Sequence, residues 1–328
     1  MAGVREVSER VGYRYTLDAD GRTICPPGFV VSAVDQLRAC LSLREHDIVV
    51  TTYPRSGTTW MQQLVLLLLR DEGAAVTPMV EAPWFELSVS NAITGRTSST
   101  PARTPAELAT LPPPDPGVDR GRRVWKTHAP AGRVPWVGGI TGAAAARAKI
   151  ILVCRNPKDA AVSMLHHATD GPSFGWRGNG WDDFAPLFLE GQVESSSWWD
   201  WHRGWYDAVG AADTDAVLWV TYEEMDADLE AVARRVAKFL DLGVTDAHVR
   251  ACVARARFGA MKADAARRDA ATLADGGYIK KNHIREGGIG GWRSVMDAAT
   301  SAAFDARSAA LRAACPAIRV ETAEEAAQ

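Results

Sequence analysis

The sequence lacks the features by which membrane-spanning and secreted proteins are commonly recognised. Its longest apolar run, residues 64–69, is far shorter than the ~20 residues that span a bilayer. The opening stretch MAGVREVSERVGYRY contains no apolar core of a signal peptide. We therefore expect a protein without a membrane partner that is located in the cytoplasm.

Cysteine is scarce, and the cysteines do not occur in closely spaced pairs. The five cysteines are odd in number and widely separated, and none shows the close pairing that is typical of zinc sites. Cys154 lies in an apolar stretch, where a small buried thiol is the ordinary role. This pattern argues against a disulfide scaffold, fits a reducing compartment and predicts no bound metal.

An excess of positive charge is also missing. With 37 Lys and Arg residues against 40 Asp and Glu residues, the formal net charge is −3 and the pI is about 6.2. Proteins that bind nucleic acid or anionic membranes rely on a basic surface, so we expect no nucleic-acid partner and only a local phosphate site. The 328 residues, 47% of them hydrophobic, suffice for a large core.

The order of apolar runs predicts an α/β fold with a central parallel sheet flanked by helices. Strands are expected at 47–53, 150–153 and 216–220 and within 124–130, and helices at 60–70, 160–167 and 225–240. We interpret 1–328 as one domain. It comprises a lead-in at 1–46 with a strand near 29–31 and a helix over 34–43, a Pro-rich surface loop at 94–123 with a short helix near 106–111, and a disordered tail at 320–328.

The turn PRSGTT joins the first predicted buried strand to a helix. Such a turn directs the N–H groups of Ser56, Gly57, Thr58 and Thr59 toward one point at a helix N-terminus, which favours an anion, and Arg55 adds a formal charge. The nucleotide triphosphatase motif GxxxxGK[ST] is absent. The turn therefore predicts a phosphate cradle, although similar turns also serve as plain strand-to-helix connections.

Three further polar segments follow apolar ones. KTH ends the strand within 124–130, RNPKD follows the strand at 150–153, and REGGIGG holds closely spaced glycines. Ligands of open parallel sheets bind outside the carboxyl ends of the strands, so PRSGTT, KTH and RNPKD can converge on one site. The tryptophan-rich stretch 195–209 has a different interpretation: its Trp198, Trp201 and Trp205 share a helical face that favours burial.

Together these stretches resemble the cytosolic sulfotransferases, which move a sulfuryl group from 3′-phosphoadenosine-5′-phosphosulfate (PAPS) to a hydroxyl or amine. TYPRSGTTW matches the family's TYPKSGTTW, KTHAP its KTHLP, RNPKDAAVS its RNPKDVAVS, YEEM its YEDM and REGGIGGWR its RKGxxGDWK, in the family's order. The resemblance implies a P-loop-like three-layer fold and a PAPS-dependent enzyme (product PAP) that acts on a small-molecule acceptor.

The resemblance also assigns residues. It implies that Arg155, Ser163, Arg285 and Gly287 bind the 3′-phosphate. The other cofactor-binding residues that it implies are Arg55, Ser56, Gly57, Thr58, Thr59, Trp60, Tyr222 and Phe258, of which the three aromatic residues contact the adenine. The regions of Trp84, Phe85, Trp136 and His166 line the acceptor pocket in this family, which suggests an apolar or aromatic acceptor. From the sequence alone, Trp84 and Phe85 fit a core position as well.

The residue types suit this chemistry. Sulfuryl transfer, like phosphoryl transfer, depends on positioning and on cations around a spread charge. His128, whose ordinary pKa is near ~6.5, can take the acceptor's proton. Lys126 and Arg55 can hold the sulfuryl group and the oxygen that leaves, so no metal is required.

Two departures from the family pattern leave alternatives open. Arg55 replaces the family's lysine, and Glu286 replaces the lysine of RKG beside the expected 3′-phosphate. The family's dimer motif is not retained from Arg293 onward, so the oligomeric state is open. A nucleotide or small-molecule kinase, and a PAPS-binding or PAP-binding protein without turnover, are the alternatives to the sulfotransferase interpretation.

Overall fold

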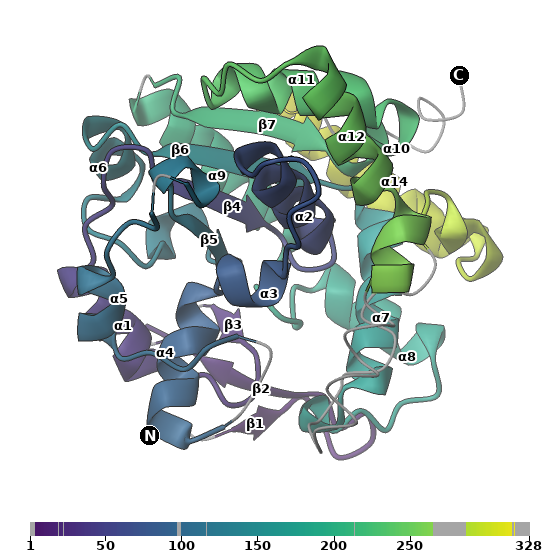
Figure 1. The fold of residues 1–328 in the computed structure, drawn as a ribbon. Coiled ribbons are helices and arrows are strands. Elements are labelled where there is room, and N and C mark those ends of the chain that lie inside the picture. Colours follow the sequence, from purple (N-terminus) through teal and green to yellow (C-terminus); the bar gives the residue numbers. More distant parts are fainter. Residues whose placement is uncertain are drawn as a thin grey trace.

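The structure is a computed structural model that describes residues 4–18, 20–21, 23–96, 100–115, 117–212, 214–264, 287–316 and 318. Its centre is a four-stranded parallel sheet in the order β5-β4-β6-β7 (Figure 1). The strands are β4 (Ile48–Thr52), β5 (Val124–Thr127), β6 (Lys149–Cys154) and β7 (Val217–Thr221). This arrangement confirms the predicted α/β fold.

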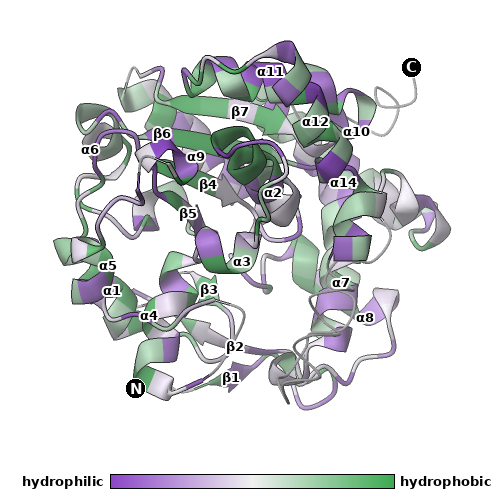
Figure 2. Ribbon diagram, viewed as in Figure 1, coloured by the Kyte–Doolittle hydropathy of each residue, from purple (hydrophilic) through white to green (hydrophobic). Residues whose placement is uncertain are grey.

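Successive residues of the central strands face opposite sides of the sheet and enter two different cores. Val49 and Ile150 belong to the larger core, whereas Val50 and Ile151 belong to the other. Both sides of the sheet are therefore covered, as the continuous apolar character of these strands predicts. Figure 2 shows β7, next to α11, coloured mostly as hydrophobic.

Helices cover each side of the sheet. The smaller core lies between the sheet and α2 (Thr58–Leu69), α10 (Tyr222–Ala227), α11 (Leu229–Phe239) and α12 (Asp246–Ala256). The larger core includes α1 (Val31–Cys40), α4 (Phe85–Thr94), α5 (Pro105–Thr110), α6 (Gly139–Ala145), α7 (Pro157–Asp170), α8 (Trp181–Leu189), α9 (Trp198–Ala212) and α14 (Ala298–Ala314). In α9, Trp198, Trp201 and Trp205 are buried, as predicted.

The lead-in differs from the prediction. Residues 29–30 are not in a strand, and the helix α1 begins at Val31. A small antiparallel sheet of β1 (Arg5–Glu6), β2 (Arg14–Leu17) and β3 (Ile24–Cys25) lies before it. The short apolar run at 29–31 gave no sign that it would open a helix, because three apolar residues fit either structure.

The predicted helix over 225–240 is in fact two helices. It is interrupted at Asp228, whose side chain accepts a hydrogen bond from the N–H of Ala231 and so caps α11. The short helix predicted within the loop 94–123 is present as α5, where Thr104 and Glu107 form a capping box. The single-domain organisation stays a prediction, and the tail 320–328 lies outside the described residues.

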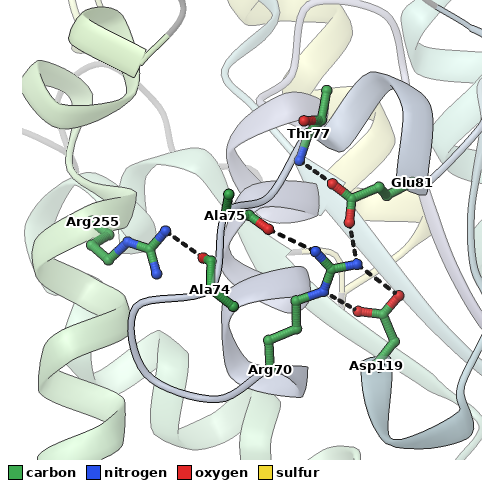
Figure 3. A network of polar contacts seen from close by, with 7 residues as sticks. All are labelled: Arg70, Ala74, Ala75, Thr77, Glu81, Asp119 and Arg255. Carbon is green, nitrogen blue, oxygen red and sulfur yellow. Dashed lines mark hydrogen bonds and ion pairs between the residues drawn. The ribbon is translucent and has the colours of Figure 1, made fainter. Parts of the chain in front are cut away.

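A polar network at the end of α2 fixes the segment that leads to the site (Figure 3). The guanidinium group of Arg70 donates to Asp119 and to the carbonyl oxygen of Ala75, and it pairs with Glu81 of α3 (Pro78–Glu81). Arg255 of α12 donates to the carbonyl oxygen of Ala74. These bonds hold residues 74–81 in place just before Trp84, which belongs to the site described next.

Candidate active site

The PRSGTT turn connects β4 to α2 and has the backbone of a tight cradle. Gly57 caps α2 with a φ of 96°, and a Cβ there would lie 2.8 Å from Cδ2 of Tyr222. Glycine is thus required both by the left-handed backbone and by the aromatic ring. The hydroxyl oxygen of Ser56 is buried and has no hydrogen-bond partner within the described residues. The turn therefore offers an unused donor at a helix N-terminus, where anions are favoured.

Two arginines meet at this turn. Arg55 also has a positive φ, of 70°, and its Nε donates to the hydroxyl of Ser163 on α7 (3.1 Å). Arg155, at the end of β6, donates to the carbonyl oxygen of Arg55 (3.0 Å) and to that of Gly288 (2.9 Å). The structure thus brings the cradle and RNPKD together, as the sequence predicted, and Gly288 of the glycine-rich stretch joins them.

The glycine-rich stretch is held against α7 by a residue that the sequence analysis did not select. The carboxylate of Asp159 accepts from the N–H groups of Gly290 (2.8 Å) and Trp292 (3.2 Å). Gly287 lies against Phe258, since a Cβ at Gly287 would lie 2.6 Å from that ring. The position of Asp159 in RNPKD, next to the turn, was the signal that could have found it.

Aromatic side chains gather beside the cradle. Trp60 and Tyr222 contact edge to face with ring centroids 5.1 Å apart, and the guanidinium carbon of Arg155 lies 4.2 Å from the Tyr222 ring centroid. Burial raises the pKa of Tyr222, so its hydroxyl is protonated and accepts from the N–H of Gly288 (3.1 Å). Arg285, which was assigned to the same region, lies outside the described residues.

The KTH triplet ends β5 next to the cradle. The Nδ1 atom of His128 is 2.8 Å from the carbonyl oxygen of Thr52, which can only accept, so this nitrogen carries the proton. The Thr52 hydroxyl is 3.2 Å from the same nitrogen and 2.7 Å from the hydroxyl of Thr58 in the cradle. In the neutral ring, a proton on Nδ1 leaves Nε2 unprotonated, so that this atom can act as a base.

The Trp84 ring contacts both Lys126 and His128 of the KTH triplet. The Lys126 ammonium lies 4.3 Å from the centroid of the Trp84 ring, and the His128 ring lies edge to face against the same indole at 4.8 Å. Both Lys126 and His128 are nearly buried, at 5% and 8% exposure. A buried cation beside the base creates a local positive field in which negative charge is stabilised more than in water.

A cavity opens at His128. It encloses about 610 Å³ between protein atoms, including space open to solvent. Apolar walls come from Ile24, Pro26, Phe29, Val31, Val34, Trp84, Ala129 and Pro130, and polar ones from Asp18, Asp35, Arg38, Glu86, Arg133, Glu194 and Ser195. Most of these residues come from the lead-in, which the sequence analysis did not connect with the site.

The four residues assigned to the acceptor pocket are not together. Trp84 lines the cavity, but Phe85 is fully buried and stacks on Trp125 at 4.7 Å. Trp136 is also buried, with its indole N–H donating to the carbonyl oxygen of Gly139 (2.8 Å). His166 is half-buried on α7 and is not part of the cavity lining. Phe85 occupies a core position, because adjacent residues at the start of α4 point in different directions, and Trp136 is a core residue of another segment.

The comparisons with known proteins decide the family. A model of the sulfotransferase domain matches residues 45–314. The chain belongs to the sulfotransferase family. Mouse sulfotransferase 2B1 is 29% identical over 80% of this chain and 70% of its own length, and rabbit amine sulfotransferase is 27% identical over 80% and 79%. Family membership makes this chain an enzyme of sulfuryl transfer and removes the basis of the kinase alternative.

The fold agrees with that assignment. The structure of retinol dehydratase in complex with androsterone and inactive cofactor PAP matches with a TM-score of 0.72 and 18% identity, covering 98% of each chain. Within the described ranges, no helix is long and apolar enough to span a membrane. Nor do the described His, Cys, Asp and Glu side chains form a group of three or more that could hold a metal ion.

Proposed function

We propose that this sulfotransferase moves the sulfuryl group of PAPS to a hydroxyl or amine of a small acceptor, with His128 as the general base. The observation that carries the proposal is the hydrogen bond from Nδ1 of His128 to the carbonyl oxygen of Thr52. It fixes the tautomer whose Nε2 is basic, in a residue that lines the cavity and adjoins the cradle.

The residues of the cradle fit a phosphate-bearing cofactor. The buried hydroxyl of Ser56 has no partner among the described residues, and Gly57 leaves room that a Cβ would fill. The Nε of Arg155 is likewise buried without a hydrogen-bond partner in the described part of the chain. Such donors favour an anion because unpaired buried polar groups are costly. Two solved structures with a similar fold contain PAP, which accords with this use of the site.

When bound, PAPS supplies a sulfuryl group on a good leaving group. Residues Arg55, Ser56, Thr58 and Thr59 would hold its 5′ end, with Arg155, Ser163 and Gly287 at the 3′-phosphate. Arg55 of the first set donates to the hydroxyl of Ser163 of the second set (3.1 Å). Trp60, Tyr222 and Phe258 would contact the adenine, for which their rings offer a flat apolar surface.

His128 would accept the proton that the reaction releases. Its Nε2 can accept the proton that the acceptor hydroxyl or amine loses on attack, while Nδ1–H stays bonded to Thr52. Lys126, 5% exposed, places a cation beside the reacting atoms and lowers the cost of the negative charge that develops there. The apolar wall around Trp84 limits the access of water, which would compete as an acceptor.

The acceptor is expected to be a small molecule with an apolar or aromatic body. The wall formed by Phe29, Trp84 and their apolar neighbours offers the surface for it. Relatives of this chain are named for an amine and for luciferin, and retinol dehydratase was crystallised with androsterone. We also infer a cytoplasmic location from the similarity of this chain to the cytosolic sulfotransferases.

Two assays test this proposal. Isothermal titration should show that PAP binds and that Mg-ATP does not compete with it at equal concentration. A panel of phenols, alcohols and amines with ³⁵S-labelled PAPS should then give labelled products. Binding of PAP without transfer to any acceptor would support the alternative of a binding protein without turnover.

A further inference from the structure

The glycine-rich stretch at 287–292 has a backbone that needs support from outside. Gly287, Gly288 and Gly290 have positive φ values of 69°, 94° and 80°. Glycine adopts this region without strain, but it also loses more conformational freedom on folding than any other residue. The stretch therefore keeps one conformation only where other parts of the protein bind it.

Asp159 supplies two of these supporting contacts. It lies in the first turn of α7 and is 5% exposed. Its Oδ2 accepts from the N–H of Gly290 (2.8 Å) and its Oδ1 from the N–H of Trp292 (3.2 Å). Hydrogen bonds to a charged acceptor are about twice as strong as neutral ones. One carboxylate on a helix thus fixes the backbone of the stretch at two positions.

Lys158, the preceding residue of α7, holds the same stretch by a side chain. Its ammonium is 4.3 Å from the centroid of the Trp292 ring. The same ammonium donates to the hydroxyl of Ser301 (2.7 Å) and pairs with Asp305 (2.7 Å), both on α14. The first turn of α7 therefore holds Trp292 by its backbone and by its ring.

The stretch in turn holds Arg155. The carbonyl oxygen of Gly288 accepts from Nη2 of Arg155 (2.9 Å), and the N–H of Gly288 donates to the hydroxyl of Tyr222 (3.1 Å). The Nε of Arg155 is buried and has no hydrogen-bond partner in the described ranges. The direction of this unused donor therefore depends on where Gly288 lies.

The charge of Asp159 works against a phosphate at this place. Arg155 and Gly287 are the residues proposed above for the 3′-phosphate, and Asp159 binds the stretch that contains Gly287. A carboxylate repels a nearby phosphate, and burying it costs free energy. Only the hydrogen bonds of Asp159 can therefore favour binding of the phosphate.

We propose that Asp159 is a positioning residue for the 3′-phosphate, because it fixes the glycine-rich stretch so that Gly288 orients Arg155 toward that phosphate. The inference rests on the proposed function, since both concern the same cofactor. It makes a prediction of opposite sign from charge alone. Removal of a merely repulsive acid would tighten PAP, whereas removal of a positioning residue weakens PAP and spares a ligand that lacks the 3′-phosphate.

Titration of Asp159→Asn with two nucleotides tests the inference. The substitution removes the charge at nearly constant shape and presents an amide N–H₂ in place of one acceptor oxygen. Adenosine 5′-monophosphate has the adenine and the 5′-phosphate of PAP but no 3′-phosphate. The preference for PAP over adenosine 5′-monophosphate should fall by at least about fivefold, the lower end of the usual coupling between two sites.

Asp182→Asn is the matched control. Asp182 is an exposed acid in the first turn of α8, so its substitution removes a charge from a helix N-terminus without touching the glycine-rich stretch. This variant should keep the wild-type preference for PAP.

Hydrogen exchange of the wild type gives a second test that needs no variant. Coupling between sites is reciprocal, so a 3′-phosphate that depends on the stretch must also stabilise it. PAP should therefore slow amide exchange at 287–292, and adenosine 5′-monophosphate at saturation should slow it much less. This measurement decides the matter if Asp159→Asn does not fold.

The outcomes separate this inference from the proposed function. A lower preference for PAP in Asp159→Asn, with the preference of Asp182→Asn unchanged, supports the inference. An unchanged or higher preference, an equal loss for both nucleotides, or equal protection of 287–292 by both nucleotides overturns it. Failure of the wild type to bind PAP overturns both proposals, whereas binding of PAP without transfer to any acceptor counts against the proposed function alone.

Discussion

Thr52 joins the base to the cradle. Its carbonyl oxygen lies 2.8 Å from Nδ1 of His128, and its hydroxyl lies 2.7 Å from that of Thr58 at the start of α2. One residue at the end of β4 therefore sets both the tautomer of the histidine and its position relative to the helix N-terminus. Positioning of this kind matters because a displacement of about 1 Å can cost ~10²-fold in rate.

The first prediction concerns Gly57. Gly57→Ala places a methyl group 2.8 Å from the ring of Tyr222 and a side chain on a backbone with a φ of 96°. We expect a destabilisation of about 1–3 kcal/mol and a loss of PAP affinity of at least about tenfold. Gly73→Ala is the control, since its φ is 87° and nothing lies within 4 Å of its Cβ. Equal PAP affinity in both variants, measured by titration, would show that the cradle does not use this space.

The second prediction concerns Arg155. Arg155→Ala should weaken PAP by about 10- to 150-fold, the range of a lost charged hydrogen bond. Adenosine 5′-phosphosulfate, which lacks the 3′-phosphate, should be affected much less. Removal of Arg155 also frees the carbonyl oxygens of Arg55 and Gly288, but that effect falls on both ligands. Arg203→Ala, on an exposed part of α9, serves as control. A uniform loss for both ligands would make Arg155 a purely structural residue.

The third prediction is a pH dependence at Glu86. Burial raises its pKa from 4.5 to about 7, so the folded state holds the proton more tightly than the unfolded state. Its contribution to stability is therefore fully present below about pH 4.5 and is lost as the pH rises through about 7. The shift corresponds to on the order of 3 kcal/mol.

Urea unfolding at pH 5 and pH 8 measures this effect. The stability of Glu86→Gln relative to the wild type should rise between the two pH values, because glutamine has no charge to bury. Glu45→Gln, at an exposed position, should show no such change relative to the wild type. A pH-independent difference between Glu86→Gln and the wild type would mean that Glu86 titrates normally.

Local sequence patterns predicted the parts of the fold that depend on local forces. The β-branched strand before PRSGTT and the apolar helix after it appear as β4 and α2, and Asn156 caps α7 where RNPKD follows β6. Because parallel strands end at one edge of the sheet, the polar turns after β4, β5 and β6 could be expected to meet. They do meet, through contacts such as that of Arg155 with Arg55.

Contacts between segments that are distant in the chain could not be predicted from the sequence. The cavity lining from 18–38 depends on how the antiparallel strands β2 and β3 and the helix α1 pack, and no periodicity records that. Nothing local distinguishes Glu86, which bonds Thr127 in the interior, from a solvated glutamate. Likewise, Trp84 and Phe85 are adjacent aromatic residues, yet Trp84 lines the cavity and Phe85 is buried in the core.

Arg285 and Glu286 come directly before the described glycines of the REGG segment. Arg285 and Glu286 lie outside the described residues, so their predicted places beside the phosphate stay predictions. Gly287 and Gly288, which follow them, contact Phe258 and Tyr222. If Glu286 faces the phosphate, Glu286→Lys should tighten PAP binding at low salt, with a gain that shrinks as the ionic strength rises. Unchanged or weaker binding at low salt would place Glu286 elsewhere.

The measurement that tests the central claim most directly is single-turnover transfer from PAPS by His128→Ala, alongside titration with PAP. The account predicts that the transfer rate falls by about 10²- to 10⁴-fold, the contribution of general-base catalysis, while PAP affinity stays within about twofold of the wild type. His46→Asn, an exposed histidine remote from the cradle, should transfer at the wild-type rate. Transfer by His128→Ala at the wild-type rate would contradict the account and remove His128 from the mechanism.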